Sequence, residues 1–287
     1  MQRREVLFAL AAALTVAGKT SEASTKTAVD AQDSTNSRND ASAAPKRADG
    51  AKPFRIAMVI FPKMTQLDFT GPFDVLARIP DAEVLVVAQT LEPVVSDAGL
   101  RILPTHTFET AGMADLLFVP GGPGQNAQMT NPAMIDYLRR VGRQASWVTS
   151  VCTGSLLLAA AGLLDGYRAT CHWLSIDQLS LFDVTAEPRR IVIDRNRITG
   201  AGVTSGVDFA FSVVAKLRGD ELAKRLELLL EYDPAPPFRT GSPQLAGPAM
   251  VADVRQLVFE DRFDMPTSFR AEEVERIVHH HDPVRPL

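Results

Sequence analysis

The sequence predicts a three-layer α/β/α sandwich built on a mostly parallel β-sheet. Short, almost wholly apolar runs alternate with segments in which apolar residues recur at helical spacing. Such runs are typical of strands buried on both faces of a parallel sheet, and their alternation with helices is typical of βαβ units. The composition agrees, because 46% of the residues are hydrophobic and 22% are charged, as is ordinary for a globular protein.

The expected elements follow in chain order. The first strand covers 54–61 (FRIAMVIF) and ends at Pro62, and a helix over 67–79 opens near 68–72 (DFTGP). A hairpin-like excursion is expected where 94–95 and 101–103 flank the turn 96–99. Further strands are expected at 83–88, 114–119, 147–151, 168–171, 190–193 and 197–200. Further helices are expected at 132–145, 156–164, 174–182, 204–217 and 221–232.

The N-terminus predicts an export signal. Arg3 and Arg4 precede an apolar run over 6–18 that is too short to span a bilayer, and small residues follow near 21–23. We therefore expect a signal peptide over 1–23, of the twin-arginine type, although Gln2 stands where Ser or Thr is more typical. The protein is then exported, to the periplasm. The alternative is a mis-assigned start codon and a cytoplasmic protein that begins near residue 54.

Composition divides the rest of the chain. Residues 24–53 are mostly small and polar and cannot bury enough surface to fold, so we expect a disordered linker. The folded catalytic domain is expected over 54–242, and 243–287 is a C-terminal extension. The proline-rich stretch 233–248 is expected to be stiff and extended. The adjacent histidines 279–281 resemble a metal site, but neighbours in sequence rarely chelate one ion, so we prefer a solvated tail.

Cys152 is the candidate nucleophile. It ends the β-branched run 147–151 and is followed at once by a small-residue turn and an apolar helix pattern. This strand, turn and helix present a nucleophile at the top of a parallel sheet in nucleophile-elbow enzymes. The helix dipole and free N–H groups are expected to favour the thiolate and so lower the thiol pKa. The alternative is a small, inert buried cysteine.

Other polar residues also follow strands. Asp68, the Gly121-Gly122 pair, Cys152 and His172 stand at or just after inferred strand ends. Ligands of open α/β sheets bind outside the carboxyl ends of the strands. We therefore expect these residues to converge on one site.

Six motifs in collinear order resemble the ThiJ/PfpI superfamily, whose members are glutamine-amidotransferase-like, flavodoxin-like α/β sandwiches. The resemblance covers about 54–242, and it is greatest to the isonitrile hydratase family within that superfamily. The motifs are QLDFTGP (66–72), VPGG (119–122), TSVCTGS (149–155), RATCHW (168–173), GAGVTSGVDFA (200–210) and EYDPAPPF (231–238).

The resemblance implies an enzyme. In the isonitrile hydratase family a cysteine, an aspartate and the threonine after the cysteine carry the reaction, and they fall on Cys152, Asp68 and Thr153. The implied activity is that of a hydro-lyase, which converts an isocyanide and water to an N-substituted formamide. Peptidase-like relatives carry a histidine directly after the cysteine, so Thr153 argues against a protease. One departure is Cys171, where we expect threonine beside His172; it places a second sulfur near the site.

Physical reasoning supports these roles. The Cys152 thiolate attacks the isocyanide carbon to give a thioimidate, which water hydrolyses. Asp68 is the acid and base, and burial beside a thiolate is expected to raise its pKa. Thr153 hydrogen-bonds substrate or water, and the N–H groups of Gly122 and Thr153 are expected to face developing negative charge. We assign the Gly121-Gly122 pair and His172 to this substrate and oxyanion region.

Each site residue also has a purely structural interpretation. Asp68 is equally suited to cap a helix, and Thr153 to be an ordinary residue of a helix N-terminus. His172 pairs with Trp173 as a packed, hydrogen-bonded residue, and the two glycines at 121–122 serve a close backbone turn. The two cysteines are expected to be free thiols, but an exported protein can form a disulfide, so a redox switch stays open.

Charge and motif content limit the partners. The formal charge of -4 provides neither a nucleic-acid footprint nor a polybasic membrane patch. We expect a small-molecule substrate, no stable membrane insertion, no metal or other cofactor, and a homodimer as in the superfamily. A DNA-binding regulator is disfavoured, since residues 243–287 hold no basic helical pattern. A redox- or stress-responsive protein, or another hydrolase or glyoxalase-type enzyme that uses the same cysteine, is the alternative.

Overall fold

A seven-stranded sheet lies at the centre of the computed structural model, which describes residues 52–259. Its strands are β1 (Phe54–Val59), β2 (Ala82–Ala88), β5 (His106–Thr107), β6 (Leu116–Val119), β7 (Trp147–Val151), β10 (Ile191–Asp194) and β11 (Arg197–Gly200). The strand order is β10-β11-β7-β6-β1-β2-β5, and every pairing is parallel except β10 with β11. The predicted mostly parallel sheet is confirmed.

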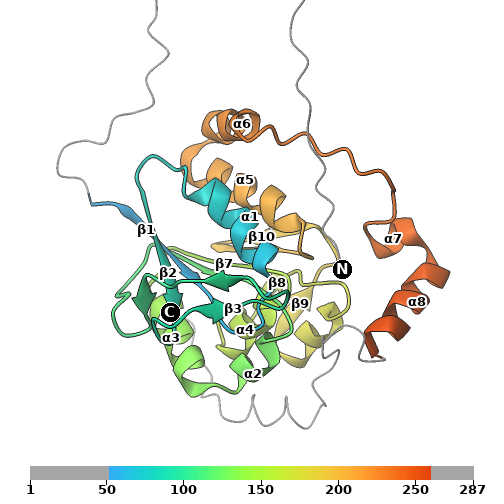
Figure 1. Cartoon of the computed structure of the whole chain (residues 1–287), viewed down its shortest axis with the longest axis horizontal. Helices are drawn as coiled ribbons and strands as arrows, with labels where there is room; N and C mark the ends of the chain where they lie inside the picture. The colour runs from blue at the N-terminus through green and yellow to red at the C-terminus, as the bar shows by residue number, and fades with distance from the viewer. Residues whose placement is uncertain (1–51, 260–287) are drawn as a thin grey trace, which may run out of the picture. The chain divides into compact units, whose positions relative to one another are not determined.

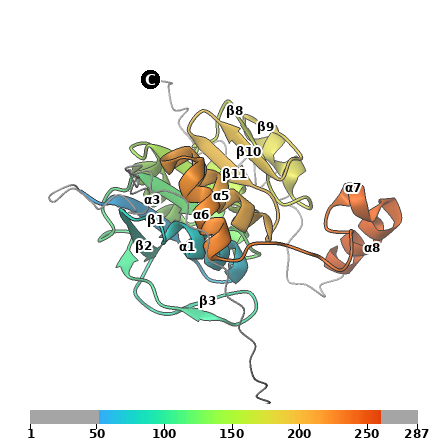
Figure 2. The same cartoon turned by 90° about the horizontal axis from the view of Figure 1, so that it is seen from above.

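Helices cover both faces of the sheet (Figure 1). One layer holds α1 (Gln66–Leu76), α5 (Ser205–Arg218) and α6 (Asp220–Leu229). The other holds α2 (Gln125–Met129), α3 (Pro132–Gly142) and α4 (Gly154–Ala160). The view from above shows α5 and α6 side by side over the strands (Figure 2). The three-layer sandwich is therefore confirmed.

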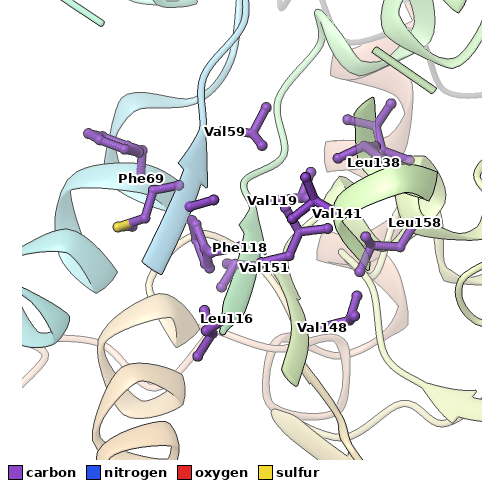
Figure 3. Packing of buried hydrophobic residues seen from close by; sticks show 14 of the residues in the cluster. Val59, Phe69, Leu116, Phe118, Val119, Leu138, Val141, Val148, Val151 and Leu158 are labelled. Atoms are coloured by element: carbon purple, nitrogen blue, oxygen red, sulfur yellow. The ribbon is translucent and has the colours of Figure 1, made fainter. Parts of the chain in front are cut away.

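Strand side chains alternate between these two layers. On β6, the ring of Phe118 lies 5.8 Å from that of Phe209 in α5. Figure 3 shows Phe69 of α1 on the same side as Phe118, and Leu138 of α3 with Leu158 of α4 on the opposite side. All five side chains are buried, and each contributes on the order of 2 kcal/mol by leaving water. The sheet is therefore held rigidly from both faces, and its strand ends are well defined.

A close approach of α1 to α5 positions the start of α1. The helix begins at Gln66 and continues through Pro72, so it starts slightly earlier and ends earlier than predicted. Pro72 gives up one helical hydrogen bond, but its ring packs against Gly206 of α5, where an added Cβ would lie 3.1 Å from the ring. The third residue of α1 is Asp68, and this contact holds it at the edge of the sheet.

Several small elements differ from the predictions. The strand expected at 168–171 is β8 (Tyr167–Ala169), which pairs with β9 (Val184–Ala186) in a separate two-stranded sheet. The helix expected at 174–182 is a 3-10 helix, η1 (Ile176–Leu181). The hairpin of β3 (Val94–Val95) and β4 (Arg101–Ile102) is confirmed. Neither β5 nor α2 was predicted, because two and five residues are too few to show a period.

The stretch expected to be extended, 233–248, is irregular only over its first part. It contains a short helix, α7 (Pro243–Ala246), in which the Ser242 side chain accepts from the Leu245 N–H. Then α8 (Pro248–Phe259) follows, and its Arg255 guanidinium lies 5.3 Å from the centre of the Trp173 ring. Within residues 52–259 we find no helix with the length and apolarity that a membrane crossing requires. The signal peptide, most of the linker and the histidines at 279–281 lie outside the described residues.

Candidate active site

Cys152 occupies a sharp turn between β7 and α4. Its φ of 60° lies in the left-handed region, which a non-glycine residue rarely adopts. Its N–H donates to the carbonyl groups of Gly200, the last residue of β11, at 3.0 Å, and of Ala201 at 2.7 Å. The neighbouring strand thus holds the turn, and the side chain is only 1% exposed. Strain of this kind, held by the surrounding fold, is common at functional sites.

Asp68 is fully buried beside this turn, with 0% of its surface exposed. Its Oδ2 accepts the N–H of Gly121 at 3.0 Å, whereas its Oδ1 has no hydrogen bond of ordinary geometry with any described residue. The Cys152 thiol lies close enough to this carboxyl group to lower its pKa. Burial raises the pKa of Asp68 to about 7, against the lowering effects of the thiol and of the Gly121 N–H. The predicted rise in this pKa is confirmed.

The Cys152 thiol, by contrast, has a pKa raised well above its ordinary value. The prediction of a lowered pKa is wrong for this structure. Burial is the main cause, and the charges of Asp68 and Cys171 add to it, while the N–H of Thr153 acts in the opposite direction but is too weak. The following helix, α4, has only seven residues, so its dipole cannot offset the loss of water. In the resting site the sulfur therefore keeps its proton, and the carboxyl group loses its proton first.

Thr153 and the two glycines close the site on a third side. Thr153 Oγ1 accepts the N–H of Gly122 at 3.0 Å. This bond occupies the Gly122 N–H, so this group is not free to face developing negative charge, contrary to the expectation. The N–H of Thr153 still faces the sulfur of Cys152. A Cβ at Gly121 would lie 2.7 Å from Thr153 Oγ1 and 2.8 Å from Cys152 Cβ. Backbone at 121 thus contacts all three predicted reaction residues, because its N–H also binds Asp68.

His172 lies next to this cluster but does not join it. Burial lowers its pKa to about 4, so the ring is neutral at pH 7. Nδ1 accepts the N–H of Leu174 at 3.3 Å, and the ring packs against Gly202 and Trp173. No interaction described for residues 52–259 connects it to Cys152. The packed interpretation of His172 therefore accounts for all its contacts.

Sequence reasoning missed two groups that shape the site. Asp97, in the turn between β3 and β4, adds negative charge that raises the pKa of Asp68, and it accepts from Thr65 Oγ1 at 2.6 Å. Its only signal in the sequence was that of a turn residue. The second group is a buried serine pair behind Cys152, in which the Ser150 and Ser155 hydroxyl oxygens lie 2.9 Å apart. Hydroxyl groups at those positions gave no periodic signal.

The described part of the chain contains no cluster of three or more His, Cys, Asp or Glu side chains suited to hold a metal ion. The site does contain two ionisable groups in contact, the Cys152 thiol and the Asp68 carboxyl group. A cysteine on a strained strand–helix elbow, with a buried acid beside it, is the arrangement of an α/β enzyme that works through a covalent nucleophile.

The chain belongs to the DJ-1/PfpI family, whose family model matches residues 54–216. It is 46% identical, over 202 residues, to the isonitrile hydratase of Pseudomonas putida, a match that covers 70% of this chain and 89% of that protein. A crystal structure of a ThiJ/PfpI family protein from Pseudomonas syringae is 40% identical, with a TM-score of 0.71, and covers 83% of this chain and 98% of that chain. The HTH-type transcriptional regulator CdhR of Pseudomonas aeruginosa is 36% identical over only 39% of its length. The predicted superfamily resemblance is confirmed.

Proposed function

We propose that this protein is a cysteine-dependent hydro-lyase that adds water to an isocyanide and releases an N-substituted formamide. The similarity to the Pseudomonas putida isonitrile hydratase carries the proposal, because it extends over 89% of that enzyme. The roles of Cys152, Asp68 and Thr153 are part of the proposal. They are supported by the buried contacts that join all three to the backbone at Gly121.

The first step forms a carbon–sulfur bond. The Asp68 carboxylate takes the thiol proton of Cys152, and the sulfur attacks the terminal carbon of the isocyanide. Asp68 then delivers the same proton to that carbon, which yields a thioimidate on Cys152. A carboxyl pKa of about 7 suits this exchange, because Asp68 is then able both to accept and to return the proton near neutral pH.

The second step consumes water. Asp68 removes a proton from the water that attacks the thioimidate carbon and passes it to the nitrogen of the intermediate. Collapse of the tetrahedral intermediate breaks the carbon–sulfur bond, and the proton of its hydroxyl group passes to the leaving sulfur as the formamide departs. The sum is one isocyanide and one water converted to one formamide, with Asp68 and Cys152 returned to their starting states.

Thr153 holds the reacting groups in place. Its hydroxyl group fixes the Gly122 loop, and its N–H lies on the sulfur side of the turn. The Gly121-Gly122 backbone positions Asp68 against the sulfur.

The test is turnover of cyclohexyl isocyanide by the full chain, followed as formamide formation. Cys152→Ala should abolish turnover, and Cys152→Ser, which preserves the size of the side chain, should reduce it severely. Wild-type protein quenched during turnover should carry a mass increase equal to one isocyanide on the peptide that contains Cys152. Unchanged turnover in Cys152→Ala would rule out the mechanism, and no turnover by the wild-type protein would rule out the substrate class.

We also propose a homodimer without a nucleic-acid partner. The chain's formal charge of -4 does not favour binding to a polyanion. Light scattering of the purified protein tests the dimer. A gel-shift assay with duplex DNA at low salt tests the second point, and a retarded band there would contradict it.

We further propose that the protein is exported to the periplasm through the twin-arginine route, on the strength of Arg3, Arg4 and the apolar run after them. Replacing both arginines with lysine should retain the protein in the cytoplasm, whereas wild-type protein should fractionate with the periplasm. Equal distribution of the two forms would support the cytoplasmic alternative.

A further inference from the structure

Cys171 is a buried thiol that the proposed reaction does not use. The chain has two cysteines, and in the structure both are free and only 1% exposed. Any disulfide within one chain must therefore join Cys152 to Cys171. A second sulfur beside a nucleophile is a group whose chemistry needs an explanation.

Hydrogen bonds between their sequence neighbours connect the two chain segments that carry the cysteines. Ser155, three residues after Cys152, donates through its hydroxyl group to the carbonyl of Thr170 at 2.7 Å, and Thr170 directly precedes Cys171. The Thr170 N–H in turn donates to Thr199 Oγ1 at 2.9 Å, and Thr199 pairs with Ser150, two residues before Cys152. Cys171 is thus one residue, and Cys152 two residues, from a residue that contacts Thr199.

The charges around the two sulfurs agree with this placement. The charge of Cys171 contributes to the raised pKa of Cys152, and the charge of Asp68 contributes to the raised pKa of both thiols. Asp68 is therefore close enough to influence protons on either sulfur. Cys171 also follows β8, which belongs to the small sheet with β9 rather than to the main sheet. Thr170, the residue before it, is hydrogen-bonded to Thr199 of β11 and so holds Cys171 beside the main sheet.

We propose that Cys152 and Cys171 form a reversible disulfide when the protein meets hydrogen peroxide. The Cys152 sulfur attacks one peroxide oxygen, so that a sulfur–oxygen bond forms and the oxygen–oxygen bond breaks; the leaving hydroxide takes the thiol proton and departs as water, and the product is a sulfenic acid. The Cys171 sulfur then attacks the Cys152 sulfur, the sulfur–oxygen bond breaks, the leaving hydroxide takes the Cys171 proton as a second water, and the disulfide forms. Two thiols and one peroxide are thus converted to one disulfide and two waters, and a dithiol reductant reverses the oxidation.

The consequence is protection of the nucleophile. A sulfenic acid without a nearby thiol is open to irreversible oxidation to the sulfinic acid, whereas a disulfide is recoverable. The disulfide also removes the free sulfur that the proposed hydration requires. Cys171 is accordingly a resolving cysteine, and the disulfide that it forms with Cys152 inactivates the protein reversibly. This inference needs a reactive Cys152 but does not depend on isocyanide as the substrate.

The experiment uses the full, reduced chain treated with a small excess of hydrogen peroxide and then with iodoacetamide. In the wild-type protein both cysteines should become resistant to alkylation at the same time. Digestion should release a pair of peptides joined by a disulfide between Cys152 and Cys171. Dithiothreitol should restore both thiols and nearly all of the isocyanide turnover. This mapping needs no variant, and it gives an answer even if isocyanide is not turned over.

Cys171→Ser and Cys171→Thr are the matched variants. Both should be oxidised at Cys152 to the sulfinic acid under the same treatment, and dithiothreitol should restore almost none of their turnover. Thermal unfolding of the reduced variants checks that each is folded. Wild-type protein that accumulates sulfinic acid at Cys152 while Cys171 remains alkylatable would overturn the proposal. Equal recovery of wild-type and Cys171→Ser protein would also overturn it.

Discussion

Asp68→Asn should make the protein more stable above neutral pH while it removes the proposed acid and base. The carboxyl group is fully buried, and only one of its oxygens has a hydrogen-bond partner among the described residues. Asparagine has nearly the same shape and can accept the Gly121 N–H in the same way, but it never carries a charge. The substitution therefore removes the ionised carboxylate and leaves the packing in place.

The magnitude follows from the pKa. Asp68 has an ordinary pKa of 3.8 and a pKa of about 7 in the fold. A difference of roughly three units, at about 1.4 kcal/mol each, gives an upper limit of about 4 kcal/mol. Because the folded state holds the proton more tightly, this contribution to stability is complete below pH 3.8 and is lost as the pH rises through 7. Above pH 7 the wild-type protein therefore carries the whole cost of the buried charge.

Urea unfolding at a series of pH values between about 4 and 9 measures this cost, with each unfolding free energy taken from the midpoint and slope. The difference between Asp68→Asn and wild type should be small near pH 4 and should grow in favour of the variant until it levels off above pH 7. Cys152→Ala is the control, since it keeps the carboxyl group; because it removes the thiol that lowers the pKa of Asp68, its stability should decline with pH at least as much as that of the wild type. Parallel curves for wild type and Asp68→Asn would refute the assignment of a raised pKa to Asp68.

Three further predictions concern the site. The kcat/KM for cyclohexyl isocyanide should rise about tenfold per pH unit below about pH 7 and then level off, because Asp68 must be ionised to take the thiol proton; a rate independent of pH would contradict this. Thr153→Val should lower the free energy of unfolding by about 1–3 kcal/mol, since it leaves the buried Gly122 N–H unpaired. Thr153→Ser keeps the hydroxyl group and should retain most of the wild-type stability in the same urea assay. Gly122→Ala should lower the melting temperature severely, because the residue has a φ of 124° and its Cβ would collide with the Thr65 N. Gly99→Ala, with a φ of 89° and open space around it, is the control and should lower the melting temperature far less.

Much of the fold was predictable because its signals are local. The central strands are continuous apolar runs, and residues 116–119 and 148–151 are buried in the structure as expected. The elbow at Cys152 was also readable, since a β-branched strand, a cysteine and small residues stand next to one another in the chain. The small sheet of β8 and β9 was not predictable, because its three-residue strands acquire their pairing only through tertiary contacts.

The protonation states of the site could not be read in the same way. The sequence correctly predicted a raised pKa for Asp68, since burial of the carboxyl group is its main cause, although the neighbouring thiol lowers this pKa rather than raising it. It wrongly predicted a lowered pKa for Cys152, because the helix after it is visible in the sequence but the depth of burial is not. Cys171 was expected near the site from its motif, whereas Asp97 affects the site from the hairpin, and no spacing in the chain indicates its approach.

The sequence by itself determined the order of strands and helices, the family resemblance and the position of the nucleophile on its turn. Each of these depends on residues that are adjacent or regularly spaced, so the information is present in a single stretch of chain. Only the tertiary structure decided which N–H groups are occupied by hydrogen bonds, which of Asp68 and Cys152 holds its proton, and that Asp97 approaches the site from the hairpin. Those properties depend on burial and on charges brought together from distant segments, because electrostatic energies in a buried site are set by distance in space and by the exclusion of water.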